Sequence, residues 1–281
     1  MTLTTSRSAL LLCARQELTL AVRSRWTQTF AVVFAALSLG VALSGYILSG
    51  GSGVQEFART AVSLVQLVLL LVPLTAIVIG VLALAPDRGA AELLFSQPVA
   101  RWKILLGKLL GLFEALIGAQ ALGFGASGLV IFSRAGSDGV TSFVALIGGA
   151  AVLTAVFLGI AALIAAGSTG RRTRALAVAL VVWFVAVVLF DLAALGVASL
   201  LRSGHASRLL ITAVLINPVD AVRTGTLLAI EGTAAFGAAS LALLRFTGGA
   251  TGAAVVLSCS LVLWTVVPIG LAARRLSRAD V

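Results

Sequence analysis

The sequence predicts an all-α membrane protein, a single bundle of six transmembrane helices. Hydrophobic residues make up 60% of the chain and charged residues only 11%, whereas soluble domains contain about 25% charged residues. The apolar residues form long unbroken runs, and about 20 such residues cross a bilayer as a helix. Strands of a membrane barrel would instead alternate apolar and polar residues. We therefore expect one transmembrane domain over residues 1–281.

The elements follow in order from the positions of the apolar runs. Residues 8–26 mix arginines with leucines, a pattern that favours a helix lying along the membrane interface; an extension of the first span is the alternative. Six later segments are long enough to cross about 30 Å of hydrocarbon at about 1.5 Å per residue. These predicted spans are residues 27–49, 61–85, 109–133, 142–166, 175–200 and 250–272.

Basic residues gather at alternate ends of the predicted spans. The positive-inside rule places the richer set of ends in the cytoplasm. Both termini are then cytoplasmic, and the connection between spans five and six is external. The basic residues at the predicted cytoplasmic ends are Arg7, Arg15, Arg23, Arg25, Arg88, Arg101, Lys103, Lys108, Arg171, Arg172, Arg174, Arg274, Arg275 and Arg278.

The cytoplasmic connection over residues 86–108 is too long for a simple turn. It predicts a short helix over residues 88–96, a break at Gln97 and Pro98, and an amphipathic lead into the third span. An apolar side chain on a short helix is suited to a groove of a partner protein, although an amphipathic segment resting on the bilayer is the alternative. The residues expected to make the contact are Glu92, Leu93, Leu94, Phe95, Ser96, Gln97, Pro98 and Arg101.

The external connection over residues 202–249 contains a helix start. Asn217 can accept a hydrogen bond from the first helical turn, Pro218 suits the first helical position, and Asp220 favours the positive end of a helix. A short helix is expected to run through Ile230 and to end near Gly232.

Two acidic residues lie inside predicted spans, Glu114 in the third and Asp191 in the fifth. Burying a carboxylate in lipid costs several kcal/mol, so each is expected to face protein or water. Glu114 shares one helical face with small residues that let another helix approach closely. Either residue then makes an interhelical hydrogen bond or takes part in conduction or coupling. The glycines of this predicted packing seam are Gly107, Gly111, Gly118 and Gly125.

Several classes of chemistry find no support in the sequence. It contains no GxxxxGK[ST] phosphate-binding loop, so ATP hydrolysis is not expected on this chain. His205 has no neighbour at metal-site spacing, and Met1 is the single methionine, which leaves few soft ligands for copper(I). The basic residues flank apolar segments instead of lining a polar face, so nucleic acid is not an expected partner. We predict no catalytic residue and no metal site.

Several segments together resemble a known family. Residues 92–98 (ELLFSQP) come shortly before residues 105–111 (LLGKLLG), and Trp183 comes before Phe190, Asp191 and Leu192 in the fifth span. The external region adds residues 217–220 (NPVD), followed by Arg223 and then Glu231 and Gly232. These motifs resemble type-2 ABC permeases, and most closely the NosY-type permeases, the membrane subunit associated with copper-site maturation of nitrous oxide reductase.

The resemblance implies a set of partners. It implies a homodimer in the bacterial inner membrane, surrounded by lipid, with two cytoplasmic ABC ATPases that hold ATP and Mg²⁺ and grip the coupling helix of residues 92–101. No cofactor is expected on this chain itself. A periplasmic β-helical protein would contact the external helices, and the residues expected there are Asn217, Pro218, Asp220, Arg223 and Glu231.

The function implied is that of a permease driven by ATP, which moves a sulfur species for the copper site or drives its periplasmic partner mechanically. Three alternatives stay open. An ABC efflux permease for drugs, lipids or peptides would share the fold. A proton-coupled secondary transporter would use Glu114 and Asp191 as its ionisable pathway residues. A membrane anchor or assembly factor would show no coupling to nucleotide.

Overall fold

The computed structural model describes residues 2–47, 53–85, 100–135, 140–168, 171–201, 203–231 and 238–278. Within these ranges every regular element is helical. Six spans are long and apolar enough to cross a membrane. The predicted fold class and the predicted number of spans are therefore confirmed. The predicted short helix over residues 88–96 and the break that follows it lie outside the described residues.

Each predicted span coincides with a helix, and all of these helices except α2, which has the same length as its predicted span, are longer than the apolar runs. This difference arises because apolar runs mark the hydrocarbon-facing part of a helix, whereas polar residues continue it into the interface. The fifth span is interrupted by a π-helical turn, Val185–Leu189. The spans are α2 (Arg25–Ile47), α3 (Gly53–Leu84), α5 (Arg101–Ala135), α6 (Val140–Gly167), α7 (Arg172–Phe184) with α8 (Phe190–Leu200), and α12 (Ala250–Arg278).

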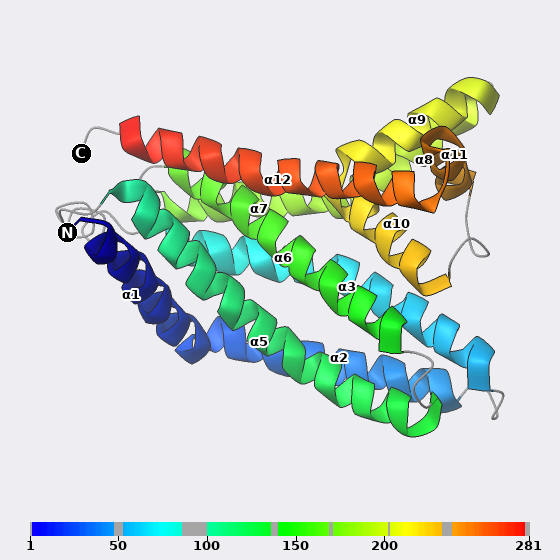
Figure 1. Cartoon of the computed structure of the whole chain (residues 1–281), viewed down its shortest axis with the longest axis horizontal. Coiled ribbons are helices and arrows are strands. Elements are labelled where there is room, and N and C mark those ends of the chain that lie inside the picture. Colours follow the sequence, from blue (N-terminus) through cyan, green and yellow to red (C-terminus); the bar gives the residue numbers. More distant parts are fainter. Residues whose placement is uncertain are drawn as a thin grey trace.

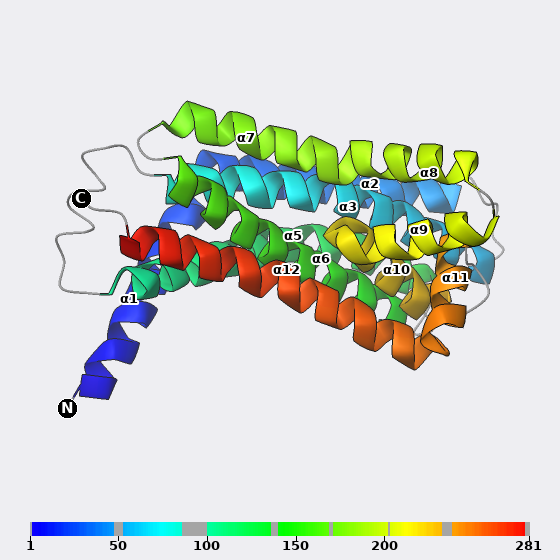
Figure 2. The same cartoon turned by 90° about the horizontal axis from the view of Figure 1, so that it is seen from above.

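In the part of the chain that the structure describes, four further helices lie outside these spans: α1 (Thr2–Arg23), α9 (Ser203–Ile216), α10 (Pro218–Glu231) and α11 (Ala238–Thr247). Figure 1 shows the start of α1 and the end of α12 at one end of the bundle and α9 and α11 at the other. In Figure 2, α1 runs at a steep angle to the bundle. The break at Ser24 makes α1 a separate helix, so the first span does not extend through it.

The centre of the bundle is formed by α3 and α6. In the most apolar stretch of each span, half of α3 and 56% of α6 are buried, against 11% of the α7–α8 span and of α12. Val72 and Ile77 of α3 and Leu153 and Phe157 of α6 are fully buried. Figure 2 shows the α7–α8 span and α12 along opposite edges, with α3 and α6 between them. The two outer spans therefore expose most of their apolar surface.

Two glycines let α1 pack closely against the first turns of α5. A Cβ atom added at Gly107 would lie 2.7 Å from the Cβ atom of Cys13. One added at Gly111 would overlap the carbonyl oxygen of Ala14 and lie 2.7 Å from the backbone nitrogen of Leu18. Only a residue without a side chain allows backbones to approach this closely. The glycines therefore fix how α1 lies across the base of α5.

Replacing Gly111 with alanine is expected to destabilise the protein by about 2 kcal/mol, because the new methyl group meets a backbone carbonyl that cannot turn aside. The matched control is Gly118→Ala on the same helix, where an added Cβ has nothing within 4 Å. That change should be neutral or stabilising by up to about 1 kcal/mol, through helix propensity. Thermal unfolding of both variants in the same detergent measures the difference, and equal melting temperatures would contradict the prediction.

Candidate functional site: a polar cluster between the fifth span and a bent helix pair

The site is built around a sharp break between α9 and α10. Residues 205–216 and 218–230 form two helical segments bent by 100° at Asn217. The side-chain oxygen of Asn217 accepts a hydrogen bond from the backbone nitrogen of Val219, at 3.0 Å. The predicted helix start is therefore confirmed, with Asn217 as the cap and Pro218 as the first helical residue.

The end of α9 is held by the outer helix α12. The hydroxyl of Ser260 donates to the carbonyl oxygen of Leu215 at 2.6 Å, and the indole nitrogen of Trp264 donates to that of Ile216 at 2.9 Å. These two carbonyls lie in the last turn of α9, where no backbone donor follows within the helix. Side chains of α12 therefore supply hydrogen-bond donors to the carbonyl oxygens that the bend leaves unbonded at the end of α9.

The other side of the bend contacts the π-helical turn of the fifth span. In this turn the backbone nitrogen of Phe190 donates to the carbonyl oxygen of Val185, five residues earlier. The side-chain nitrogen of Asn217 donates to the carbonyl oxygen of the next residue, Ala186, at 2.8 Å. A π turn widens the helix and disturbs its regular hydrogen bonds. Asn217 therefore ties the bent helix pair to the irregular point of the fifth span.

An ionic network adds a second connection between the same elements. One terminal nitrogen of Arg223, on α10, lies 2.6 Å from Asp191 of α8 and 3.0 Å from Asp220 of α10. The other carboxylate oxygen of Asp220 accepts from the side-chain nitrogen of Asn217 at 3.1 Å. Because charge-assisted hydrogen bonds are the stronger kind, α8 and α10 are held together at this point.

We call Asp191, Asn217, Asp220 and Arg223 the polar cluster. Asp220 is almost fully buried, with 9% of its side chain exposed, while Asp191 and Arg223 keep somewhat more than a quarter exposed. Two carboxylates share one guanidinium, and the Nε atom of Arg223 is buried without a hydrogen-bond partner among the described residues. Within the described residues no group of three or more His, Cys, Asp or Glu side chains is arranged to hold a metal ion. The cluster therefore joins α8 to α10.

The structure brings together residues that the sequence suggested for different roles. Asp191 was predicted as an intramembrane acid, whereas Asn217, Asp220 and Arg223 were predicted to contact an external partner; all four now form one cluster. Glu231 ends α10, but its side chain lies outside the described part of the structure. Residues 92–98 of the predicted partner contact are also outside it, while Arg101 begins α5 and donates to the carbonyl oxygen of Leu276 at 2.9 Å.

The predicted glycine seam of α5 divides into two parts. Gly107 and Gly111 contact α1, as described above, whereas Cβ atoms added at Gly118 and Gly125 would meet nothing within 4 Å. Glu114 is exposed between these parts and has no hydrogen-bonding or ionic partner among the described residues. In this single chain Glu114 therefore differs from Asp191, whose charge is paired.

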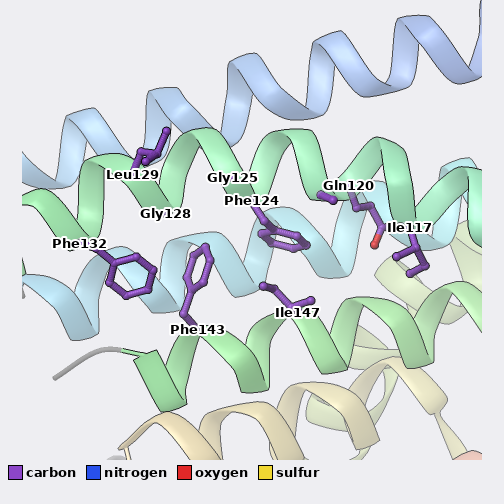
Figure 3. A pocket seen from close by; sticks show the side chains of 10 residues that line it. Ile117, Gln120, Phe124, Gly125, Gly128, Leu129, Phe132, Phe143 and Ile147 are labelled. Atoms are coloured by element: carbon purple, nitrogen blue, oxygen red, sulfur yellow. The ribbon is translucent and has the colours of Figure 1, made fainter. Parts of the chain in front are cut away.

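A groove of about 470 Å³ lies between α5 and α6, on the open side of this seam. Figure 3 shows the rings of Phe124, Phe132 and Phe143 along it. The one polar side chain in its lining is Gln120, whose amide donates to the hydroxyl of Thr154 at 2.8 Å. The lining contains no ionisable residue. A proton-coupled pathway would require ionisable side chains. The lining of this groove does not supply them.

Comparison with known proteins adds sequence similarity to this geometry. A family model for ABC-2 family transporter proteins matches residues 11–281. The chain is 34% identical over 236 residues to a protein of Pseudomonas aeruginosa named as a probable ABC transporter permease protein NosY, covering 82% of this chain and 85% of the relative. It is 33% identical over 237 residues to the protein of Stutzerimonas stutzeri with the same name, covering 81% and 85%.

Proposed function

The chain belongs to the ABC-2 family of transporter proteins and is a permease subunit, and we propose that its transporter is of the NosY type, acting in maturation of the copper site of nitrous oxide reductase. In such transporters ATP is bound by a separate ATPase subunit. The observation that carries the finer proposal is that one chain of hydrogen bonds and ion pairs links Asp191, Arg223, Asp220 and Asn217, all parts of the motifs that resemble NosY-type permeases.

The proposed mechanism passes movement from one end of the bundle to the other. Closure of two partner ATPases around ATP and Mg²⁺ pushes on the cytoplasmic segment of residues 92–101, which leads directly into α5. The central helices then shift against α12, and the fifth span moves with the central helices. Since Asn217 and Arg223 tie α10 to that span at the π turn and at Asp191, the bent helix pair changes position with it. Such coupling needs two discrete arrangements of packed elements.

The proposed assembly follows the resemblance. Two copies of this chain form a homodimer in the bacterial inner membrane, with both termini in the cytoplasm and an ABC ATPase beneath each copy. A periplasmic β-helical protein contacts the bent helix pair. Of the residues expected there, Asn217, Pro218 and Asp220 are buried and act by fixing the bend, whereas Arg223 keeps 27% of its side chain exposed. The cargo is a sulfur species for the copper site, or movement alone is delivered to the periplasmic partner.

An efflux permease is the second candidate function, and the observation that favours it is the apolar groove between α5 and α6. Its aromatic and glycine lining suits an apolar molecule such as a drug or a lipid chain. The two functions differ in what they require outside the membrane. Maturation requires nitrous oxide reductase or its assembly partners, whereas efflux requires only a cargo.

The test is deletion of the gene for this chain in its native host, followed by purification of nitrous oxide reductase. We expect the reductase to be made without copper at the site whose maturation is proposed to need this chain. Expression of the intact chain should restore the copper. Purification of the complex from the restored strain should yield an ABC ATPase together with a periplasmic protein. A reductase with full copper content in the deletion strain would contradict the maturation function and favour efflux.

A further inference from the structure

Three helices meet at one ammonium group at the end of the bundle opposite the polar cluster. The Nζ atom of Lys108, on α5, lies 3.1 Å from a carboxylate oxygen of Glu17, on α1. The same atom donates to the carbonyl oxygen of Ala83, in the last turn of α3, at 3.0 Å. Lys108 therefore joins α1, α3 and α5 at a single point.

Glu17 is the most deeply buried partner of this group. Only 8% of its side chain is exposed, against 21% for Lys108. Elsewhere α1 exposes its charges and many of its apolar side chains: Arg15 is exposed, and Leu11 and Leu12 are 64% and 66% exposed. A buried carboxylate requires a paired charge. The close approach of α1 to Gly111 places the Cβ atom of Glu17 against α5 and brings the carboxylate to Lys108.

The end of α3 is held by cations from two other spans. The carbonyls in the last turn of a helix lack backbone donors and carry partial negative charge. Arg172, at the start of α7, donates to the carbonyl oxygen of Leu82 at 2.8 Å, beside the bond from Lys108 to Ala83. The chain leaves α3 here and returns at Arg101 as α5. Lys108, on α5, therefore bonds α3, the other helix that flanks the proposed coupling segment.

We propose that Glu17 is a positioning residue for coupling: it holds Lys108 on the Ala83 carbonyl, so that α1, α3 and α5 move as one unit when the partner ATPases act on the segment of residues 92–101. This inference rests on the proposed function and adds α1 to the moving parts. Without the Glu17 carboxylate, the ammonium is free to turn toward water, and the end of α3 is no longer fixed to α5.

The experiment uses the complete complex of this chain and its ATPase in lipid nanodiscs, with Glu17→Gln as the variant. The readout is the ATPase rate of the assembled complex divided by that of the isolated ATPase subunit. We expect this ratio to fall about fivefold. The matched control is Arg15→Gln, which removes one exposed charge from the same helix and should leave the ratio unchanged. The melting temperature of each complex is measured in parallel.

A double variant separates positioning from general weakening. If Glu17 acts through Lys108, then Glu17→Gln combined with Lys108→Met should lower the ratio no further than Lys108→Met alone. Additive losses would overturn the proposal, as would a Glu17→Gln complex with a lower melting temperature and an unchanged ratio. If Leu94→Asp uncouples the complex and Glu17→Gln does not, the proposed function stands and this inference fails. If Leu94→Asp also leaves the ratio unchanged, the proposed coupling itself fails.

A distance measurement tests the shared movement directly. Spin labels at Leu12 on α1 and Leu110 on α5, both exposed, are placed in a chain whose Cys13 and Cys259 have been replaced. The distance between them should stay constant between the nucleotide-free and ATP-trapped complexes, while the distance from Leu12 to a label at the exposed Val266 on α12 changes. In Glu17→Gln the first distance should change as well. A first distance that stays constant in this variant would overturn the proposal.

Discussion

Replacing Arg223 with methionine is expected to destabilise the bundle by about 3 kcal/mol, because it leaves two carboxylates without their shared cation. Asp191 and Asp220 both lie within 3.0 Å of the same guanidinium nitrogen. Once that nitrogen is removed, the two negative charges repel each other, and Asp220 is almost fully buried. The loss should be at the lower end of the range for buried pairs, since water reaches part of Asp191. Thermal unfolding followed by intrinsic tryptophan fluorescence, to which Trp264 at the end of α9 contributes, measures it.

Two further variants show whether the repulsion is the cause. Arg223→Met combined with Asp220→Asn removes one of the two carboxylates that repel each other and should recover part of the lost stability. Asp191→Asn alone should cost only about 1 kcal/mol, because the amide oxygen still accepts a hydrogen bond from Arg223. The matched control is Glu114→Gln, which removes an exposed intramembrane carboxyl that is unpaired among the described residues, and it should change stability by less than about 0.5 kcal/mol. Equal losses of stability in Glu114→Gln and Arg223→Met would show that repulsion between Asp191 and Asp220 is not the cause.

The spans could be predicted from the sequence because the requirement for them is local. Every backbone polar group in hydrocarbon must be bonded within its own segment, so an apolar run of sufficient length has to be a helix. The start of α10 was predictable for the same reason, since the capping residue and the helix it caps are neighbours in the chain. Both predictions needed no information about which helices touch.

The partner of Asp191 could not be predicted in this way. Arg223 follows it by 32 residues, and only the 100° bend at Asn217 brings α10 back to the fifth span. The π turn has no sequence signal either, since residues 185–189 are all apolar and fit an α-helix equally well. A weaker signal did exist: an acid inside a span requires a cation, and Arg223 stands in the next connection along the chain.

The role of Glu17 was hidden by the amphipathic pattern of α1. Charges mixed with leucines predict a helix at the interface with its charges in water, and Arg15 follows this expectation. Glu17 departs from it because Gly107 and Gly111 let the α1 backbone approach α5 closely enough for Lys108 to be reached. The glycine pattern predicted that some helix would pack there but not which one, since complementarity between helices is a property of the pair.

Replacing Leu94 with aspartate is expected to abolish stimulation of the partner ATPase while the bundle stays folded. The sequence predicts that Leu94 lies on a short helix in the connection between α3 and α5, and an apolar side chain there is suited to fill a groove of the ATPase. A carboxylate in such a groove would be buried without a partner, at a cost of several kcal/mol. That cost is of the order that separates a micromolar from a nanomolar complex. The ATPase rate of the assembled complex and the amount of ATPase that co-purifies should both fall.

Two companion variants separate a docked helix from one that rests on the bilayer. Glu92→Lys reverses a charge beside the apolar residues and should weaken coupling if Glu92 meets basic side chains of the ATPase, whereas a segment resting on anionic lipid would be held more firmly by the added lysine. Ser96→Ala removes only a small hydroxyl from the same segment and serves as the matched control. A fully stimulated ATPase in both Leu94→Asp and Glu92→Lys would remove this segment from the coupling mechanism, because neither a buried apolar contact nor a charge contact would then be needed there.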